Sequence, residues 1–75
     1  MTLDEVALEA PVRIVGFISM DDAERGRLSG MGLRAGALVT KLMRTPLRDP
    51  IACLVGPQIL ALERRLLGRI RVEAA

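Results

Sequence analysis

Residues 28–36, with the sequence LSGMGLRAG, constrain the fold more than any other part of this 75-residue chain. Three glycines within seven residues disfavour a continuous helix, because each glycine costs about 1 kcal/mol relative to alanine. The apolar side chains of the same segment nevertheless favour burial. Glycine readily adopts the positive φ of helix ends and tight turns. We therefore predict a helix that ends at Gly30 or Gly32, a chain reversal, and a second turn at residues 34–36 that leads into a strand.

Five further segments have the alternation or the β-branched composition typical of strands, and they are residues 12–18, 37–44, 51–55, 58–62 and 69–73. In the first of them we expect Val12, Ile14 and Ile18 to lie on one face, and Gly16 to mark either a bulge or a close approach of another segment. Two prolines and then a Gly-Pro pair separate the middle segments, and these residues predict turns. The ten residues before Pro11 predict a short turn or an entry segment that Pro11 ends.

Two short helices are expected between these strands. Asp21 is a good N-cap, and a glutamate follows three residues later in the register of a capping box, which predicts a helix over residues 22–30. This helix has a weak apolar stripe, so we expect it to contact the sheet through Leu28 and Met31. One or two helical turns are expected over residues 63–67, ended by the glycine that follows them.

The length allows one small domain, which we expect to comprise residues 1–75. Apolar residues make up 51% of the chain, but they include one Phe and no Tyr or Trp, so the core must be aliphatic. We predict a mainly β fold with one or two short helices: a small five-stranded barrel, closed or nearly closed, with an inserted helix. Closure is favoured because it removes the exposed strand edges that a small open sheet would have.

The composition argues against catalysis and against a bound metal. Histidine is absent, so the commonest general base and the commonest transition-metal ligand are both missing. Cys53 is the single cysteine, and its neighbours in the sequence IACLV indicate a small buried apolar side chain. Asp21, Asp22 and Glu24 could chelate a hard cation weakly, but helix capping explains them better. We expect no catalytic residue, no cofactor and no metal site, and hence no enzyme.

The charges are distributed unevenly along the chain. Residues 1–24 hold six acids and one base, whereas residues 25–75 hold ten bases and three acids. A basic surface could bind nucleic acid, anionic lipid or an acidic protein, although a solvated face is the simpler interpretation. The acidic N-terminus does not resemble a signal peptide, and no apolar run approaches the roughly 18 residues of a membrane span. We expect a cytoplasmic protein.

Several motifs in order resemble the FeoA family of the bacterial ferrous iron transport system. They are Arg27-Leu28 followed by Met31-Gly32-Leu33 and Gly36, the proline-bracketed segment TPLRDPI at residues 45–51, the apolar segment ILALER at residues 59–64, and Ile70-Arg71-Val72. The resemblance covers nearly the whole chain and implies a Src-homology-3-like barrel. The chain departs from the family pattern at Glu9-Ala10-Pro11, where members often have a glycine turn, and this puts any partner contact there in doubt.

The resemblance also implies a partner, the cytosolic nucleotide-binding portion of the membrane transporter FeoB, which the protein would regulate. We expect no binding to nucleic acid and no insertion into the membrane. We expect the partner-binding side chains to be exposed and to include Met31, Leu33 and Arg34, together with Leu47 and Arg48 at a hairpin tip. The alternative from another class is a nucleic-acid-binding small barrel that uses the arginine-rich second half, against which the missing aromatics count. Regulators of the diphtheria-toxin-repressor family carry a similar barrel, but here no helix-turn-helix precedes it.

Overall fold

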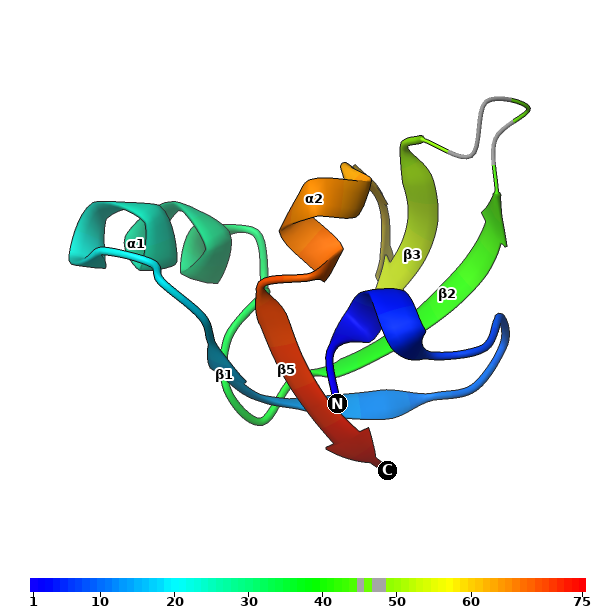
Figure 1. The fold of residues 1–75 in the computed structure, drawn as a ribbon, viewed down its shortest axis with the longest axis horizontal. Helices are drawn as coiled ribbons and strands as arrows, with labels where there is room; N and C mark the ends of the chain where they lie inside the picture. Colours follow the sequence, from blue (N-terminus) through cyan, green and yellow to red (C-terminus); the bar gives the residue numbers. More distant parts are fainter. Residues whose placement is uncertain (45, 47–48) are drawn as a thin grey trace.

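The computed structural model describes residues 1–44, 46 and 49–75, and in this part of the chain five antiparallel strands form one strongly curved sheet (Figure 1). The strand order is β4-β3-β2-β1-β5. The elements in chain order are a short 3-10 helix η1 (Leu3–Glu5), β1 (Val12–Phe17), α1 (Asp22–Gly30), β2 (Leu38–Arg44), β3 (Ile51–Val55), β4 (Gln58–Leu62), α2 (Arg64–Leu67) and β5 (Ile70–Ala74). The predicted mainly β fold with an inserted helix is confirmed.

The core lies on the concave face of the sheet, and nearly every element contributes to it. The most completely buried side chains are Leu3, Ile14, Leu33, Val39, Cys53, Leu67 and Ile70. Each buried Leu or Ile contributes roughly 1.5–3 kcal/mol relative to an exposed one. Because η1 and α2 each supply one of these side chains, the short helices close the open sides of the curved sheet.

A bulge in β1 changes which of its side chains are buried. The register between β1 and β5 shifts between Ile14 and Gly16, so the first of the two alternatives for Gly16, a bulge, is confirmed. Before the bulge, Val12 and Ile14 are buried as expected. After it, Ile18 is 40% exposed, and the prediction that it shares their face is wrong. An extra residue in one strand reverses the inward and outward alternation for the residues that follow.

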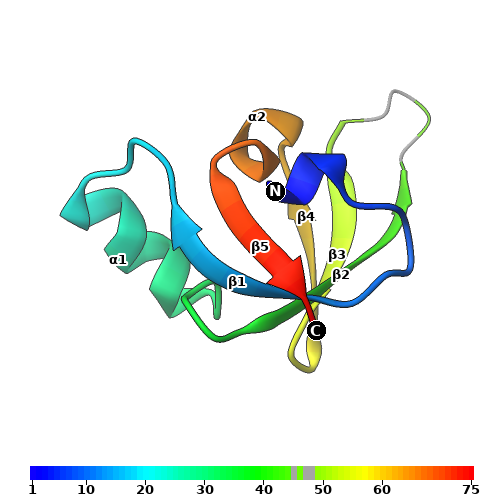
Figure 2. The ribbon, with the colours of Figure 1, turned by 60° about the horizontal axis from the view of Figure 1, so that its bottom comes forward.

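Helix α1 projects from one side of the barrel and contacts it sparingly, as Figures 1 and 2 show. Its predicted bounds are confirmed, and the Asp21 carboxylate accepts a hydrogen bond from the Glu24 amide over 2.8 Å at the N-cap. Leu28 is buried against the core, but Met31 is 38% exposed, so the prediction that both side chains dock the helix holds only for Leu28. With nine residues, α1 is the longest helix in the described part of the chain, and none there could cross a membrane.

Candidate partner-binding surface

The segment that follows α1 reverses the chain through a Schellman motif. The Leu33 amide donates to the Leu28 carbonyl over 2.9 Å, and the Gly32 amide donates to the Ser29 carbonyl over 3.0 Å. Gly32 has a φ of 90°, a conformation that side-chain-bearing residues rarely adopt. This motif usually brings together two apolar side chains, here Leu28 and Leu33, and both are buried. The chain reversal predicted from the glycines is confirmed.

A second turn then joins the loop to β1. The Ala37 amide donates to the Arg34 carbonyl over 3.0 Å, and Gly36 has a φ of 91°. The Gly36 amide donates to the Ile14 carbonyl over 2.8 Å, and the Ile14 amide donates to the Ala37 carbonyl over 2.9 Å. Apart from its two chain neighbours, no heavy atom of the described residues lies within 4 Å of the position that a Cβ of residue 36 would take. The backbone conformation, and not a lack of space, therefore requires glycine here.

The structure separates the predicted partner-binding residues into different environments. Leu33 is fully buried, so the expectation that it is exposed is wrong, because the Schellman motif directs its side chain into the core. Met31 and Arg34 are exposed as expected. Leu47 and Arg48 lie outside the described residues, and their role stays a prediction.

Met31 lines a groove of about 510 Å³ between α1 and the β4–α2 segment. Apolar side chains from both sides form much of its lining, and they include Met20, Leu28, Leu62 and Leu66. Charged side chains surround them, and these are Glu24, Arg27, Glu63, Arg65 and Arg69. Arg34 lines a different hollow of about 500 Å³, where the loop after α1 meets the Gly56-Pro57 turn. Met31 and Arg34 thus face two neighbouring hollows.

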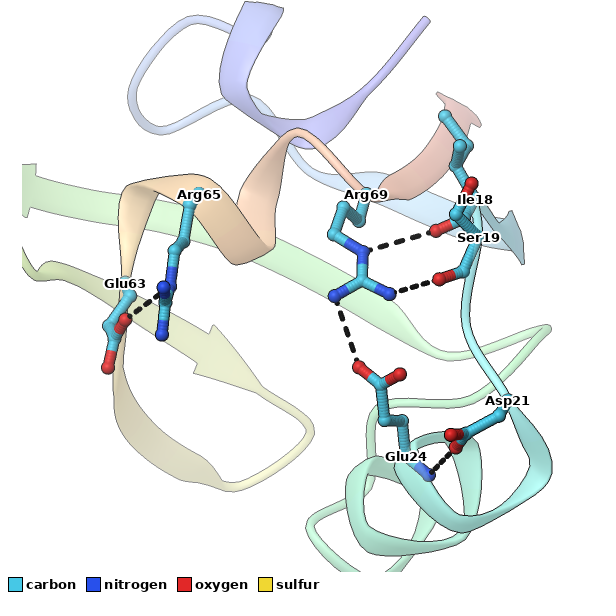
Figure 3. Close-up of polar contacts among 7 residues, drawn as sticks. All are labelled: Ile18, Ser19, Asp21, Glu24, Glu63, Arg65 and Arg69. Carbon is cyan, nitrogen blue, oxygen red and sulfur yellow. Dashed lines mark hydrogen bonds and ion pairs between the residues drawn. The ribbon is translucent and has the colours of Figure 1, made fainter.

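Arg69 fastens α1 to the barrel at one end of the groove (Figure 3). Its Nε donates to the Ile18 carbonyl over 3.2 Å, and another guanidinium nitrogen donates to the Ser19 carbonyl. A third nitrogen lies 3.1 Å from Glu24 Oε2, and both side chains of this ion pair are about one-third exposed. Arginine suits this position because its planar fork can serve three acceptors at once. No local pattern in the sequence points to Arg69, since its partners lie about 50 positions away along the chain.

The other arginines of the groove are more accessible. Arg65 pairs with Glu63 over 3.0 Å, but the two side chains are 89% and 64% exposed, so the pair contributes little to stability. Among the described residues, Arg27 forms no ion pair. The groove therefore combines an apolar lining with positive charge that remains available at its rim.

Cys53 is fully buried, as the sequence predicts. Burial raises the pKa of its thiol, an effect that the nearby Lys41 ammonium partly offsets. A raised pKa leaves little thiolate near neutral pH, and the thiolate is the reactive form. Within the described residues, no three side chains of His, Cys, Asp or Glu gather in a way that could hold a metal ion.

Solved structures with similar folds identify the architecture. The iron(II) transport protein A of Clostridium thermocellum superposes with a TM-score of 0.87 at 29% identity; the match covers all of this chain, which spans 46% of that protein. An iron uptake regulatory protein, FeoA, matches with a TM-score of 0.81 at 28% identity over all of this chain and 96% of its own. The zinc complex of FeoA from Stenotrophomonas maltophilia, described as a Src-homology-3 domain protein, matches at 24% identity and a TM-score of 0.79 over 97% of this chain and 89% of its own. The fold is therefore Src-homology-3-like.

The sequence itself gives the family. A search of curated proteins finds no significant match. The family model described as the FeoA domain, however, matches residues 1–74. FeoA proteins are non-enzymatic and are associated with ferrous iron transport. With the matched model spanning nearly the entire sequence, and with the same fold in solved FeoA structures, this chain belongs to the FeoA family.

Proposed function

We propose that this protein acts in the cytoplasm by binding the cytosolic nucleotide-binding portion of a FeoB-type transporter, and that this binding regulates ferrous iron uptake. The observation that carries the proposal is the groove between α1 and the β4–α2 segment, with Met31 in its lining. The groove is built by an otherwise sparsely docked helix.

The chemistry of the groove fits a moderate protein–protein interface. Apolar side chains at the centre with charged ones around them match the usual anatomy of such surfaces, in which Met and Arg are enriched. The flexible thioether of Met31 can adapt to an apolar side chain of the partner. Arg27 at the rim, and Arg34 in the adjoining hollow, would favour an acidic partner surface and speed its association. Leu47 and Arg48 remain proposed members of the interface.

The test is a pull-down of the transporter's cytosolic domain with the full chain and two variants, Met31→Glu and Arg34→Glu. Both side chains are exposed, so each change should alter stability by about 0.5 kcal/mol or less. We expect both variants to melt like the unchanged protein and to retain clearly less of the domain. Two matched controls are Met43→Glu, at a methionine that is 61% exposed on β2, and Arg71→Glu, at an exposed arginine on β5.

Each result has a defined meaning. Loss of binding by the Met31 and Arg34 variants, with normal binding by the two controls, supports the proposed surface. Normal binding by folded Met31→Glu and Arg34→Glu proteins would remove the groove and the loop from the interface. If all four variants lose binding in proportion to their charge change, net charge and not the groove determines the association, and the proposed surface is wrong.

A further inference from the structure

The two edge strands of the sheet, β5 and β4, differ in whether other residues form backbone hydrogen bonds with them. At β5, the N-terminal residues provide cover: the Val72 amide donates to the Met1 carbonyl over 2.9 Å, and Thr2 forms an isolated antiparallel bridge with Arg71. At β4, none of the described residues outside β3 forms a backbone hydrogen bond with the strand. One edge strand is therefore covered and the other is open.

The ladder determines which backbone groups of β4 point away from β3. A two-residue turn at positions 56–57 joins the strands, so the pair that flanks it, Val55 and Gln58, exchanges hydrogen bonds. Because the direction alternates along the strand, the backbone amide and carbonyl of Leu60 point towards β3. Those of Ile59 and Ala61 point away from it. Each copy of β4 thus presents two amides and two carbonyls along its open edge.

The open strand lacks the usual protection against pairing. Natural edge strands commonly carry charged residues, prolines or bulges that prevent association. Residues 50–62, which include all of β3 and β4, contain no charged side chain and form the longest such run in the chain. On the outer face, Ile59 is 68% exposed beside its cross-strand neighbour Leu54, which is 36% exposed. The edge is therefore both unpaired and apolar.

We propose that β4 pairs with β4 of a second copy of this chain, antiparallel, about a two-fold axis that passes beside Leu60. In this register Ile59 lies opposite Ala61 of the second copy, and Ala61 lies opposite its Ile59. Both are hydrogen-bonded pairs, so the four outward groups of each strand are all used. The large and small side chains alternate across the axis and fit one another, as a two-fold interface requires.

A second copy fits this edge because the strand is its own complement. A charged residue in β4 would meet a like charge or an apolar surface near the axis. Strand β4 contains no charged residue. Joining the copies also places Ile59 of each chain beside Ala61 of the other, and this contact removes part of the exposed apolar surface of Ile59 from water. This inference is independent of the proposed binding to a transporter.

The first test is the mass of the full chain by sedimentation equilibrium over a range of concentrations. We expect a mass that rises to twice the 8.1 kDa of one chain. Ala61→Pro should leave only the single-chain mass, because it removes an outward amide that β3 does not use, and proline is tolerated where an edge amide faces solvent. Leu38→Lys, at a leucine that is 48% exposed on β2, is the matched control and should keep the dimer. Thermal melts verify that both variants are folded.

The second test is specific for the register. In the proposed pairing, the two copies of residue 60 form a non-hydrogen-bonded pair with Cα atoms about 4.5 Å apart, within the range that a disulfide can bridge. The two copies of residue 59 are offset by two positions, beyond the limit of about 7 Å. Leu60→Cys should therefore cross-link under mild oxidation, whereas Ile59→Cys should not. The natural Cys53 is fully buried and should not contribute.

Three results would overturn the proposal. One is a single-chain mass at every concentration. Another is a dimer that persists in folded Ala61→Pro protein or that cross-links equally at residues 59 and 60, since the interface would then lie elsewhere. The third is a monomer whose Ile59→Lys variant loses the transporter domain in a pull-down: Ile59 lies outside the groove, so β4 would then pair with a strand of the transporter.

Discussion

Replacing Arg69 with glutamine should loosen the attachment of α1 to the barrel. The change removes the two hydrogen bonds to the carbonyls of Ile18 and Ser19 and the ion pair with Glu24. Hydrogen bonds to charged groups contribute about 1.5–3 kcal/mol when they are well buried. Here Ile18 and Ser19 are exposed and the ion pair is about one-third exposed, so water can replace part of each interaction.

With that discount, each contact contributes about 0.5–1 kcal/mol, and the sum is about 2 kcal/mol. In a domain of this size, a loss of 2 kcal/mol lowers the melting temperature by roughly 10 °C. Arg69→Lys should recover only part of the loss, because one ammonium cannot reproduce the planar fork that serves three acceptors. A double-mutant cycle with Glu24→Gln should give a coupling energy of about 0.5–1 kcal/mol for the ion pair itself.

The assay combines thermal melts with amide hydrogen exchange. Exchange should accelerate mainly in α1, since the contacts of Arg69 hold the connection between β1 and this helix. The matched control is Arg65→Gln, which removes an ion pair whose side chains are 89% and 64% exposed and should change stability by about 0.5 kcal/mol or less. If Arg69→Gln melts like Arg65→Gln and α1 exchanges at the unchanged rate, Arg69 does not hold the helix.

Three further substitutions test the core and the loop. Gly36→Val should destabilise by roughly 1–3 kcal/mol in denaturant melts, because valine must adopt a φ of 91°; an unchanged midpoint would mean that the turn relaxes freely. Leu33→Ala should cost about 2–5 kcal/mol by the same assay, since the side chain is fully buried, and a loss below 1 kcal/mol would contradict its place in the core. Cys53→Ser should lower the free energy of unfolding by about 1–3 kcal/mol in the same denaturant melts. Because burial raises the folded pKa of Cys53, stability should fall as pH rises past the ordinary thiol pKa of about 8.5, and Cys53→Ser should lack that fall.

Local chemistry made the elements predictable. The bounds of α1 follow from an N-cap aspartate at one end and the glycines of a Schellman motif at the other, both of which act within a few residues. The bounds of β3 follow from a short apolar run between turn residues. The burial of Cys53 follows from strict alternation within β3, whose burial pattern is regular.

What could not be predicted depends on contacts between distant residues or on a break in local alternation. The exposed position of Ile18 results from the bulge, which reverses the alternation that the sequence pattern assumes. Leu33 was expected among the exposed partner-binding side chains, yet a hydrogen bond across five residues directs it inward. The groove was unpredictable for the same reason, since α1 and α2 approach each other only through the fold.

The groove and the open edge share strand β4, and this makes the two proposed interactions separable by experiment. Ala61 belongs to both surfaces, whereas Arg69 lines only the groove and Ile59 lies only at the edge. Loosening α1 through Arg69→Gln should therefore weaken transporter binding and leave the dimer intact. Ile59→Lys should do the reverse, because a charge beside the two-fold axis repels its own copy but lies outside the groove. If each variant impairs both transporter binding and dimer formation, the two interactions use one surface, and the assignment of separate sites is wrong.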